Sequence, residues 1–321
     1  MSKFLSTPQH SVSIKHKTAL GIGFLAIFFS SQGVSMFATP YYQMTLGVDP
    51  FLLALAIKVP VILAGLFAPL VGYWSDNTNT YIGRRRPFIF IFPIMSGILF
   101  GVIWMVPPEW TNINQLIYFA VFTLLFNMVS TCWTVPMNCL VYEASTNHHE
   151  RTYIMAFVTY FLKFSSIIYH WIFPIAQLSI FSSVFVGIQY VGWGVALFVF
   201  GVCGTIPAFF VKERSAPKEK PSFSFTSSLR AVLKNKNLAI ILLLIFIQML
   251  LGNYAASVDY YIIVYHMNEG DISLGAKWKA VMSSAYAIWG IVFVFIIPRV
   301  SARIGKVAAM KCIYVLTFLA G

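Results

Sequence analysis

The stretch GYWSDNTNTYIGRRRPF, residues 72–88, decides the fold because it places three consecutive arginines between two long apolar segments. It contains one acidic residue, Asp76, and the arginines are Arg84, Arg85 and Arg86. About twenty mostly apolar residues lie on each side, which is the length that an α-helix needs to cross a bilayer. The stretch therefore predicts a short polar loop between two membrane-spanning helices.

The composition of the whole chain excludes an ordinary soluble domain. Of the 321 residues, 59% are hydrophobic and 10% are charged, whereas a soluble domain carries about 25% charged residues. So little charge cannot cover a surface exposed to water, and the composition predicts an integral membrane protein. The formal charge of +12 does not indicate nucleic-acid binding, because the basic residues stand in short segments between apolar runs.

Apolar runs of spanning length recur along the chain. They are expected at 18–42, 50–74, 87–107, 114–142, 152–175, 184–211, 238–266 and 278–298, and a ninth begins near residue 306. If each run crosses once, 18 of the 22 basic residues lie on one side, and only Lys277 and Lys279 lie on the other. Because Lys and Arg collect in cytoplasmic loops, the N-terminus is predicted to be cytoplasmic.

The charge pattern also predicts the domain organisation. The segment 212–237 is the only long connection and holds most of the loop charge. Its end, SSLRAVLKNKN, is expected to form either an amphipathic helix at the membrane surface or a solvated loop. A glycine with basic residues recurs six spans apart, in GRRRP and ARIGKV, which indicates a duplicated six-helix unit. The expected parts are a cytoplasmic N-terminus (1–17), a six-helix bundle (18–211), a cytoplasmic linker (212–237) and a partial second bundle (238–321).

Three motifs resemble the major facilitator superfamily. They are PLVGYWSDNTNTYIGRRRPF at 69–88, VPMNCLVYEASTNHHER at 135–151, and VKERSAPK at 211–218 followed by LKNKNL. The similarity is closest to the glycoside–pentoside–hexuronide cation symporter branch and the related sucrose-transporter type. The resemblance implies an all-α polytopic membrane protein with the major facilitator fold. That family has twelve spans, so the second bundle is expected either to continue beyond this chain or to be naturally short.

The resemblance also implies a cytoplasmic latch between the two bundles. Gly72 is expected to let a neighbouring helix approach closely. Asp76 is expected to accept backbone N–H groups or to face the positive end of another helix. Arg84, Arg85 and Arg86 act either in this latch or only as topology anchors. The remaining candidate gating residues are Gly83, Glu143 and Arg151, with Glu143 expected to pair with Arg151 or with the arginine run.

A lysine near the middle of the fifth span indicates a solute site. A charge at the bilayer centre costs roughly 2.5–3.5 kcal/mol, so it needs a function or a partner. Thr159, Lys163, Ser166 and His170 follow helical spacing and share one face. A polar stripe with a central lysine fits a water-filled cavity, and the alternative is a lysine packed against carbonyl groups in a helix contact.

The other candidate solute-binding residues lie in helices that line the central cavity in the family. Hydroxyl and amide groups beside aromatic rings suit a sugar, which offers hydroxyls and an apolar ring face. Hydrogen bonds between helices are the alternative role of these polar groups. Asp259 is expected to bind substrate, to pair with Lys163, or to lie at the water interface. The remaining candidates are Gln32, Tyr42, Asn127, Trp133, Asn138, Asn253 and Tyr260.

The sequence lacks the acids of a family-type sodium site. Sodium-coupled members carry acidic residues at the positions that Ala64, Ala68 and Thr134 occupy here, and acidic oxygens hold a hard cation. Proton coupling through Asp259, Glu143 or His170, or uncoupled transport, is expected instead. The sequence contains no nucleophile motif, phosphate loop or metal-ligand spacing, so no enzyme activity, metal or cofactor is expected.

These observations together predict a secondary transporter in the plasma (inner) membrane that moves a sugar or glycoside by alternating access. Its expected partners are the small solute, a co-transported proton and the lipid bilayer. A carrier of lysolipids or other small solutes is the alternative within transport. A membrane scaffold or sensor that transports nothing is the alternative from a different class.

Overall fold

The computed structural model describes most of the chain and shows it to be helical. The described residues are 12–107, 109–145, 148–211, 213, 234–305, 308–309, 311–312 and 315. Within them the backbone forms helices and turns, with a single isolated bridge between Thr80 and Gly83. The chain divides into two compact units, of which the larger contains residues 1–213 and 280–321 and the smaller contains residues 214–279.

The larger unit contains the helices that match the first six expected spans. Three stretches of the described residues carry π-helical turns, labelled η. The elements are α1 (Ile14–Phe37), η1 (Ala38–Thr45), α2 (Pro50–Asn77), α3 (Arg86–Ile103), α4 (Asn112–Glu143), α5 (His148–Ala176), α6 (Val184–Val195), η2 (Ala196–Cys203) and α7 (Ile206–Phe210). The last helix, α10 (Ile272–Ile304), begins in the smaller unit and ends in the larger one.

Short polar residues start these helices. The Oδ1 atom of Asp49 accepts hydrogen bonds from the backbone N–H groups of Phe51 and Leu52, both at 2.9 Å. Pro50 follows as the first residue of α2, where a missing N–H costs nothing. Ser13 and Thr111 cap α1 and α4 in the same manner. These caps satisfy the N–H groups that a helix start leaves unbonded.

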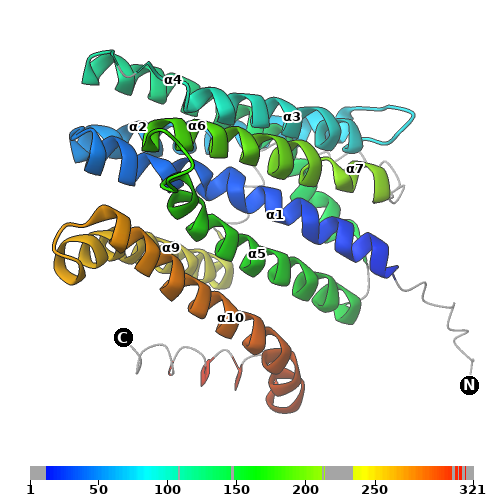
Figure 1. Cartoon of the computed structure of the whole chain (residues 1–321). Coiled ribbons are helices and arrows are strands. Elements are labelled where there is room, and N and C mark those ends of the chain that lie inside the picture. Colours follow the sequence, from blue (N-terminus) through cyan, green and yellow to red (C-terminus); the bar gives the residue numbers. More distant parts are fainter. Residues whose placement is uncertain are drawn as a thin grey trace, which may run out of the picture. The chain divides into compact units, whose positions relative to one another are not determined.

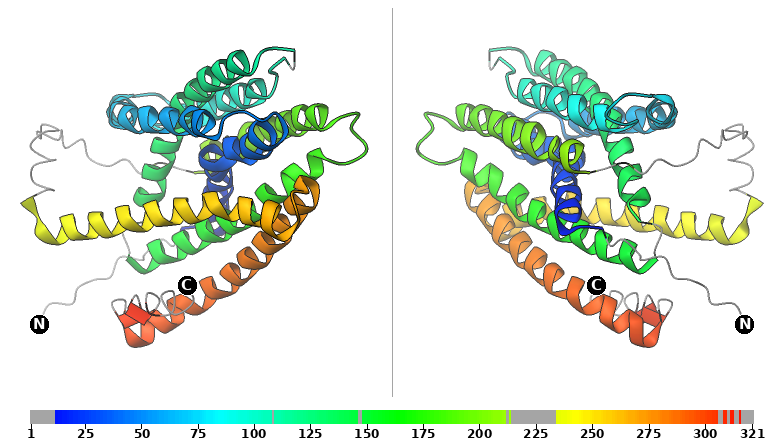
Figure 2. Two further views of the ribbon diagram at one scale, coloured as in Figure 1. Left: turned by 90° about the vertical axis from the view of Figure 1, so that its left-hand side faces the viewer. Right: turned by 90° about the vertical axis from the view of Figure 1, so that its right-hand side faces the viewer.

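The helices of the larger unit pair in a repeated pattern. The closest pairs are α2 with α4, α1 with α5 and α3 with α4, and Figure 1 shows these helices running along one another. If the first three spans are matched in order with the second three, α1 corresponds to α4 and α2 corresponds to α5. The α1–α5 pair then corresponds to the α4–α2 pair. This is the relation expected of inverted three-helix repeats within a transporter bundle. Figure 2 shows the same helices from two further directions.

Aromatic rings fill the centre of this bundle. Trp104, Phe100, Phe119 and Phe126 have relative exposures of 2% or less. Close approach of helices around them depends on small residues. A Cβ atom built at Gly97 of α3 would lie 2.7 Å from the carbonyl oxygen of Ala196 in η2, so a larger residue would push these two segments apart.

The outer faces of the helices are apolar, as a bilayer requires. In α2, Leu66, Leu70 and Ile62 are exposed to between 63% and 72%. Six helices of the described chain are long and apolar enough to cross a membrane, and they lie between residues 14 and 210. All eight expected spans coincide with helices, whereas the ninth lies largely outside the described residues.

The smaller unit contains α9 (Lys236–Tyr261), η3 (Ile262–Met267) and the start of α10. A tight turn at Glu269 and Gly270, both with positive φ, joins these segments. Asp271 accepts the backbone N–H of Leu274 at 2.9 Å and so starts α10. The expected division at residues 212–237 stays a prediction, and most of that segment lies outside the described residues.

Candidate functional site

The opening stretch forms an ion-pair cluster around Arg85. The guanidinium of Arg85 donates to Oδ1 of Asp76 from Nη2 at 2.6 Å and from Nε at 3.2 Å. Its Nη1 donates to Oε2 of Glu143 at 2.5 Å. Arg85 is 4% exposed, whereas the side chains of Asp76 and Glu143 are 50% and 42% exposed. One buried cation thus joins the end of α2, the loop and the end of α4.

The electrostatics of this cluster keep Arg85 charged. Burial lowers the pKa of Arg85, but hydrogen bonds to Glu143 and then to Asp76 outweigh it, so the pKa is raised. Removal of one partner from a buried pair costs about 3–5 kcal/mol. Because both carboxylates are half exposed, water screens them. We therefore expect removal of one partner of this cluster to cost about 1–3 kcal/mol of stability.

Glu213 completes the site, and sequence reasoning did not find it. Its Oε2 atom accepts the backbone N–H of Arg84 at 2.8 Å, and its Oε1 atom accepts those of Arg85 and Arg86 at 2.7 and 2.8 Å. A carboxylate at a helix start compensates both the unbonded N–H groups and the positive end of the helix dipole. The backbone of the arginine run therefore holds the beginning of the 212–237 connection.

Gly83 makes room for this carboxylate. Its φ angle is +123°, a conformation that side chains disfavour. A Cβ atom at this position would lie 2.8 Å from both Cδ and Oε1 of Glu213. The signal that could have located Glu213 is the lone acid in VKER, the motif that leaves the sixth span.

The other candidate gating residues have more modest contacts. Arg86 donates from Nε to the carbonyl of Ala208 at 2.6 Å, which ties α3 to α7. Arg151 donates to the carbonyl of Tyr142 at 2.8 Å and not to Glu143. An added Cβ at Gly72 would only touch Val135 of α4 at 3.9 Å, so within the described residues of the larger unit this glycine is not needed for a close approach, and its role in a latch stays a prediction.

The stripe on α5 faces α10 at Lys163. The Nζ atom of Lys163 lies 4.6 Å from the ring centre of Tyr286, as a cation–π contact. An added Cβ at Gly290 would lie 2.8 Å from Cε of Lys163, so the aliphatic part of the lysine lies along α10. No hydrogen bond or ion pair joins Lys163 to another residue in the described part of the chain. In place of the alternative carbonyl contacts, the structure gives Lys163 a ring contact, and the expected water-filled cavity stays a prediction.

Further polar and aromatic groups border this contact. Trp171 of α5 donates from Nε1 to Oγ of Ser284 in α10 at 2.9 Å. His170 forms a hydrogen bond with the carbonyl of Ser166 through Nδ1 at 2.7 Å. Tyr286 and Trp171 are 71% and 40% exposed. The α5–α10 site, which we define by Lys163, Trp171, Ser284 and Tyr286, therefore offers a cation, a hydroxyl and accessible rings.

Two candidate residues lie in the helix core instead of at an accessible surface. Trp133 is fully buried and donates to Oγ of Ser96 at 3.1 Å. Tyr42 is also fully buried, and its ring packs on Phe119 with centroids 4.8 Å apart. Both side chains are therefore covered by protein in this structure, and a solute contact for them stays a prediction.

The candidate amides of α4 form hydrogen bonds within their own helix, and neither the expected solute contact nor the alternative bond between helices is seen for them in the described residues. Asn127 and Asn138 of α4 each donate to the carbonyl four residues earlier, at 2.8 Å. Both are half-buried, and Gln32 of α1 is exposed. These bonds engage one donor each and leave the amide oxygens available. Asn253 lies in α9, but its side chain is outside the described residues.

Asp259 pairs with Lys279, one of the two lysines expected on the side opposite the other basic residues. In the smaller unit, its Oδ2 atom accepts from Nζ of Lys279. Tyr260, the next residue, is half-buried. The turn at residues 268–271 brings the start of α10 back along η3 and so brings the two charges together. Asp259 is thus neutralised within its own unit.

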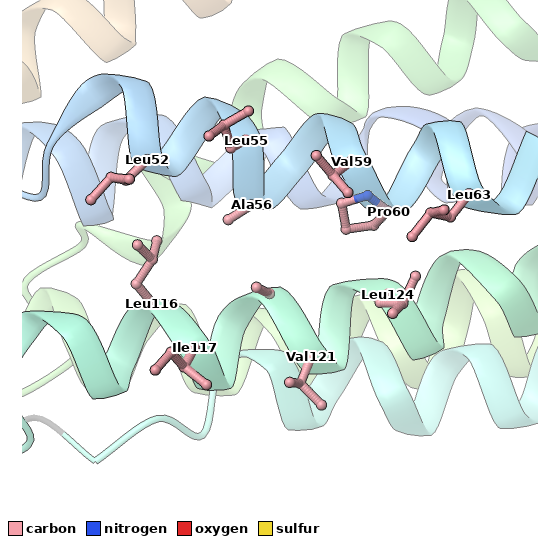
Figure 3. A pocket seen from close by; sticks show the side chains of 11 residues that line it. Leu52, Leu55, Ala56, Val59, Pro60, Leu63, Leu116, Ile117, Val121 and Leu124 are labelled. Carbon is pink, nitrogen blue, oxygen red and sulfur yellow. The ribbon is translucent and has the colours of Figure 1, made fainter.

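A purely apolar pocket of about 370 Å³ lies between α2 and α4. Figure 3 shows Leu52 and Leu63 of α2 and Leu116 of α4 in the space between the two helices, with further aliphatic side chains at its edges. Its lining residues are Leu52, Leu55, Ala56, Val59, Pro60, Leu63, Leu116, Ile117, Ala120, Val121 and Leu124. A pocket lined by apolar side chains suits a hydrocarbon chain and not a sugar.

Comparison with known families agrees with this architecture. Residues 19–321 match the family described as MFS/sugar transport protein. The chain belongs to this family. It is accordingly an all-α polytopic membrane protein with the major facilitator fold, and its family is one of membrane transporters.

The relatives of the chain include proteins with different named substrates. It is 22% identical over 307 residues to the uncharacterized symporter YnaJ of Bacillus subtilis, covering 94% of this chain and 64% of that protein. It is 25% identical over 228 residues to the putative glycoside/cation symporter YagG of Escherichia coli, covering 70% and 48%. It is 24% identical over 144 residues to the sodium-dependent lysophosphatidylcholine symporter 1 of Xenopus tropicalis, covering 44% and 27%. The chain thus spans less than two thirds of each of these relatives.

Proposed function

We propose that the chain belongs to a secondary transporter that moves a sugar or glycoside by alternating access. The observation that carries this proposal is the α5–α10 site, where Lys163, Ser284 and two exposed rings lie together. Hydroxyl groups of a sugar need donors and acceptors, and its apolar face stacks on aromatic rings. The name of the Escherichia coli relative, a putative glycoside/cation symporter, is consistent with this substrate class.

The coupling proposed for this transporter does not use sodium. Ala64, Ala68 and Thr134 offer no carboxylate oxygen for a hard cation. Glu143 and Asp259 are engaged by Arg85 and Lys279. We propose that a proton is the coupled cation, with His170 on the α5 stripe as its carrier, because histidine changes charge near neutral pH. If a pH gradient does not affect uptake, transport is not coupled to protons, and uncoupled transport is the alternative.

The Arg85 cluster supports a gating role at the cytoplasmic side. It joins α2 and α4 through a buried cation, and Glu213 joins the start of the connection to the same loop. We propose that this cluster stabilises the state closed to the cytoplasm, with the N-terminus in the cytoplasm of a cell whose plasma membrane holds the protein. The basic loop charges support that orientation.

A lysolipid carrier is the second candidate. The apolar pocket between α2 and α4 supports it, because a single acyl chain fits a space lined only by aliphatic side chains. Lysophosphatidylcholine symporters from several vertebrates are among the relatives, matching up to 44% of this chain. In this alternative, α2 and α4 bind the tail while polar groups elsewhere bind the head group.

Uptake into proteoliposomes tests the proposal. The chain is reconstituted, and entry of radiolabelled methyl β-glucoside and of labelled lysophosphatidylcholine is compared with entry into empty vesicles. The proposal expects saturable glycoside entry that excess lysolipid does not inhibit. Lysolipid entry alone would favour the second candidate. If a folded chain moves neither compound, the transport proposal is wrong and a scaffold or sensor remains.

A further inference from the structure

We propose that the indole N–H of Trp171 changes its acceptor from Ser284 to a hydroxyl oxygen of the solute, so that solute binding releases α5 from α10. This inference rests on the proposed transport function and adds the step by which binding acts on the helices. It starts from the hydrogen bond that Trp171 of α5 donates from Nε1 to Oγ of Ser284 in α10 at 2.9 Å. Both residues belong to the larger unit, although they lie 113 residues apart in the sequence.

The hydrogen-bonding capacity of the two side chains makes Ser284 and the solute competitors. An indole has a single N–H donor and no acceptor, so Trp171 serves one full acceptor at a time. The hydroxyl of Ser284 donates to the carbonyl of Ala280 in its own helix at 2.7 Å, and its oxygen accepts from Trp171. A solute hydroxyl that accepts from Nε1 must therefore displace Ser284. The displaced serine keeps its bond to Ala280, so the exchange leaves no hydroxyl proton unbonded.

The exposure of this bond allows such an exchange. Trp171 is 40% exposed and Ser284 is half-buried, so a solute can reach the N–H without opening the helix core. Trp133 provides an internal comparison, because its indole also donates to a serine hydroxyl, that of Ser96. Both Trp133 and Ser96 are fully buried. Trp133 therefore stabilises the core of the bundle, whereas Trp171 forms a bond whose acceptor can be replaced.

Exchange of the acceptor weakens the contact between the two helices. α5 lies in the expected first bundle and α10 in the expected second bundle, and alternating access requires the bundles to move against each other. A hydrogen bond between membrane helices stabilises their contact only modestly, so one bond to the solute offsets its loss. The solute has the higher affinity for the released state, in which the indole N–H is free. This difference in affinity is what shifts the equilibrium toward that state.

Binding of methyl β-glucoside to the purified chain in detergent tests the exchange. Ser284→Ala removes the competing acceptor, so it should tighten binding about three- to tenfold. Trp171→Phe keeps an aromatic ring but removes the donor, so it should weaken binding by a similar factor. In the Trp171→Phe background, Ser284→Ala should give no gain, because the two changes act on one bond. Ser283→Ala is the matched control, since it removes the neighbouring hydroxyl of α10, and it should leave the affinity unchanged.

Spin labels on the two helices measure the release itself. They are attached at Ile175→Cys of α5 and Met282→Cys of α10, both exposed positions, after replacement of the four native cysteines. Saturating methyl β-glucoside should lengthen the distance between the labels, and Ser284→Ala should lengthen it without glucoside. Unchanged or weaker binding to Ser284→Ala, a gain that persists in Trp171→Phe, or binding at an unchanged distance would overturn the inference and leave glycoside transport standing. A folded chain that neither binds nor takes up the glucoside would overturn both.

Discussion

The contact between Glu213 and the arginine run gives a sharp prediction for Gly83→Ala. An added Cβ would lie 2.8 Å from the carboxylate, so Glu213 must leave three N–H groups. Hydrogen bonds to a charged group contribute about 1.5–3 kcal/mol each. Since Glu213 is partly exposed and the three bonds share one carboxylate, we expect their combined loss to cost about 2 kcal/mol. The positive φ adds roughly 1–2 kcal/mol of strain.

Hydrogen exchange at the amides of residues 84–86 measures this loss directly. These N–H groups precede the hydrogen-bonded part of α3, so Glu213 is their acceptor. A loss of about 2 kcal/mol corresponds to exchange about thirtyfold faster. Gly47→Ala is the matched control, because Gly47 has a φ of +67° and no atom within 4 Å of an added Cβ. Any destabilisation by Gly47→Ala should therefore come from backbone strain alone.

A double-mutant cycle decides whether the effect runs through Glu213. In a Glu213→Ala background, exchange at residues 84–86 should already be fast, and Gly83→Ala should add only the strain seen at Gly47. If Gly83→Ala accelerates exchange equally with and without Glu213, the carboxylate does not occupy this loop. The proposed tie between the loop and the 212–237 connection would then be wrong.

Three further predictions concern the larger unit. Arg85→Met should destabilise the chain by about 1–3 kcal/mol in SDS unfolding, against less than about 1 kcal/mol for Arg84→Met, whose Nη2 lies 3.8 Å from Glu143. The pKa of Arg85 is raised in the folded chain. The stabilisation from this shift is fully present at pH values below the ordinary pKa of arginine and is lost only as the pH rises through the raised pKa. The loss of stability caused by Arg85→Met should therefore stay constant between about pH 6 and 9. Asp49→Ala should lower stability by about 1 kcal/mol and speed amide exchange at the start of α2. Asp49→Asn, which can also cap the helix, should retain most of this stability. Gly97→Val should cost at least about 2 kcal/mol by forcing α3 from η2, and a wild-type unfolding curve would contradict the close contact.

The spans were predictable because length and apolarity act locally. A bilayer demands long apolar helices, and the first six expected runs are such helices, while the seventh and eighth fall on helices. The charge cluster was predictable only in part. Glu143 was foreseen beside the arginine run, but Glu213 was not, because its partners are backbone N–H groups whose direction depends on the φ of Gly83.

The solute site was harder to predict, because helical spacing identifies a shared face but not what covers it. Trp133 and Asn127 both lie on α4 and were both candidates for the solute site, yet the buried ring donates to Ser96 and the amide bonds its own helix. The partner of Lys163, Tyr286, lies more than a hundred residues away on α10. Spacing within one helix carries no information about such a partner. The pairing of Asp259 with Lys279 likewise depends on a turn that reverses the chain, which spacing within one helix does not reveal.

Thiol protection at Ser166 tests the central claim, that the solute binds along the α5 stripe. Ser166→Cys, in a background where the four native cysteines are replaced, is labelled with a methanethiosulfonate reagent with and without methyl β-glucoside. We expect the solute to slow labelling at Ser166→Cys and to leave labelling of Ile117→Cys, in the apolar pocket of α2 and α4, unchanged. Labelling of Ser166→Cys at the same rate with saturating solute, or protection only at Ile117→Cys, would contradict it.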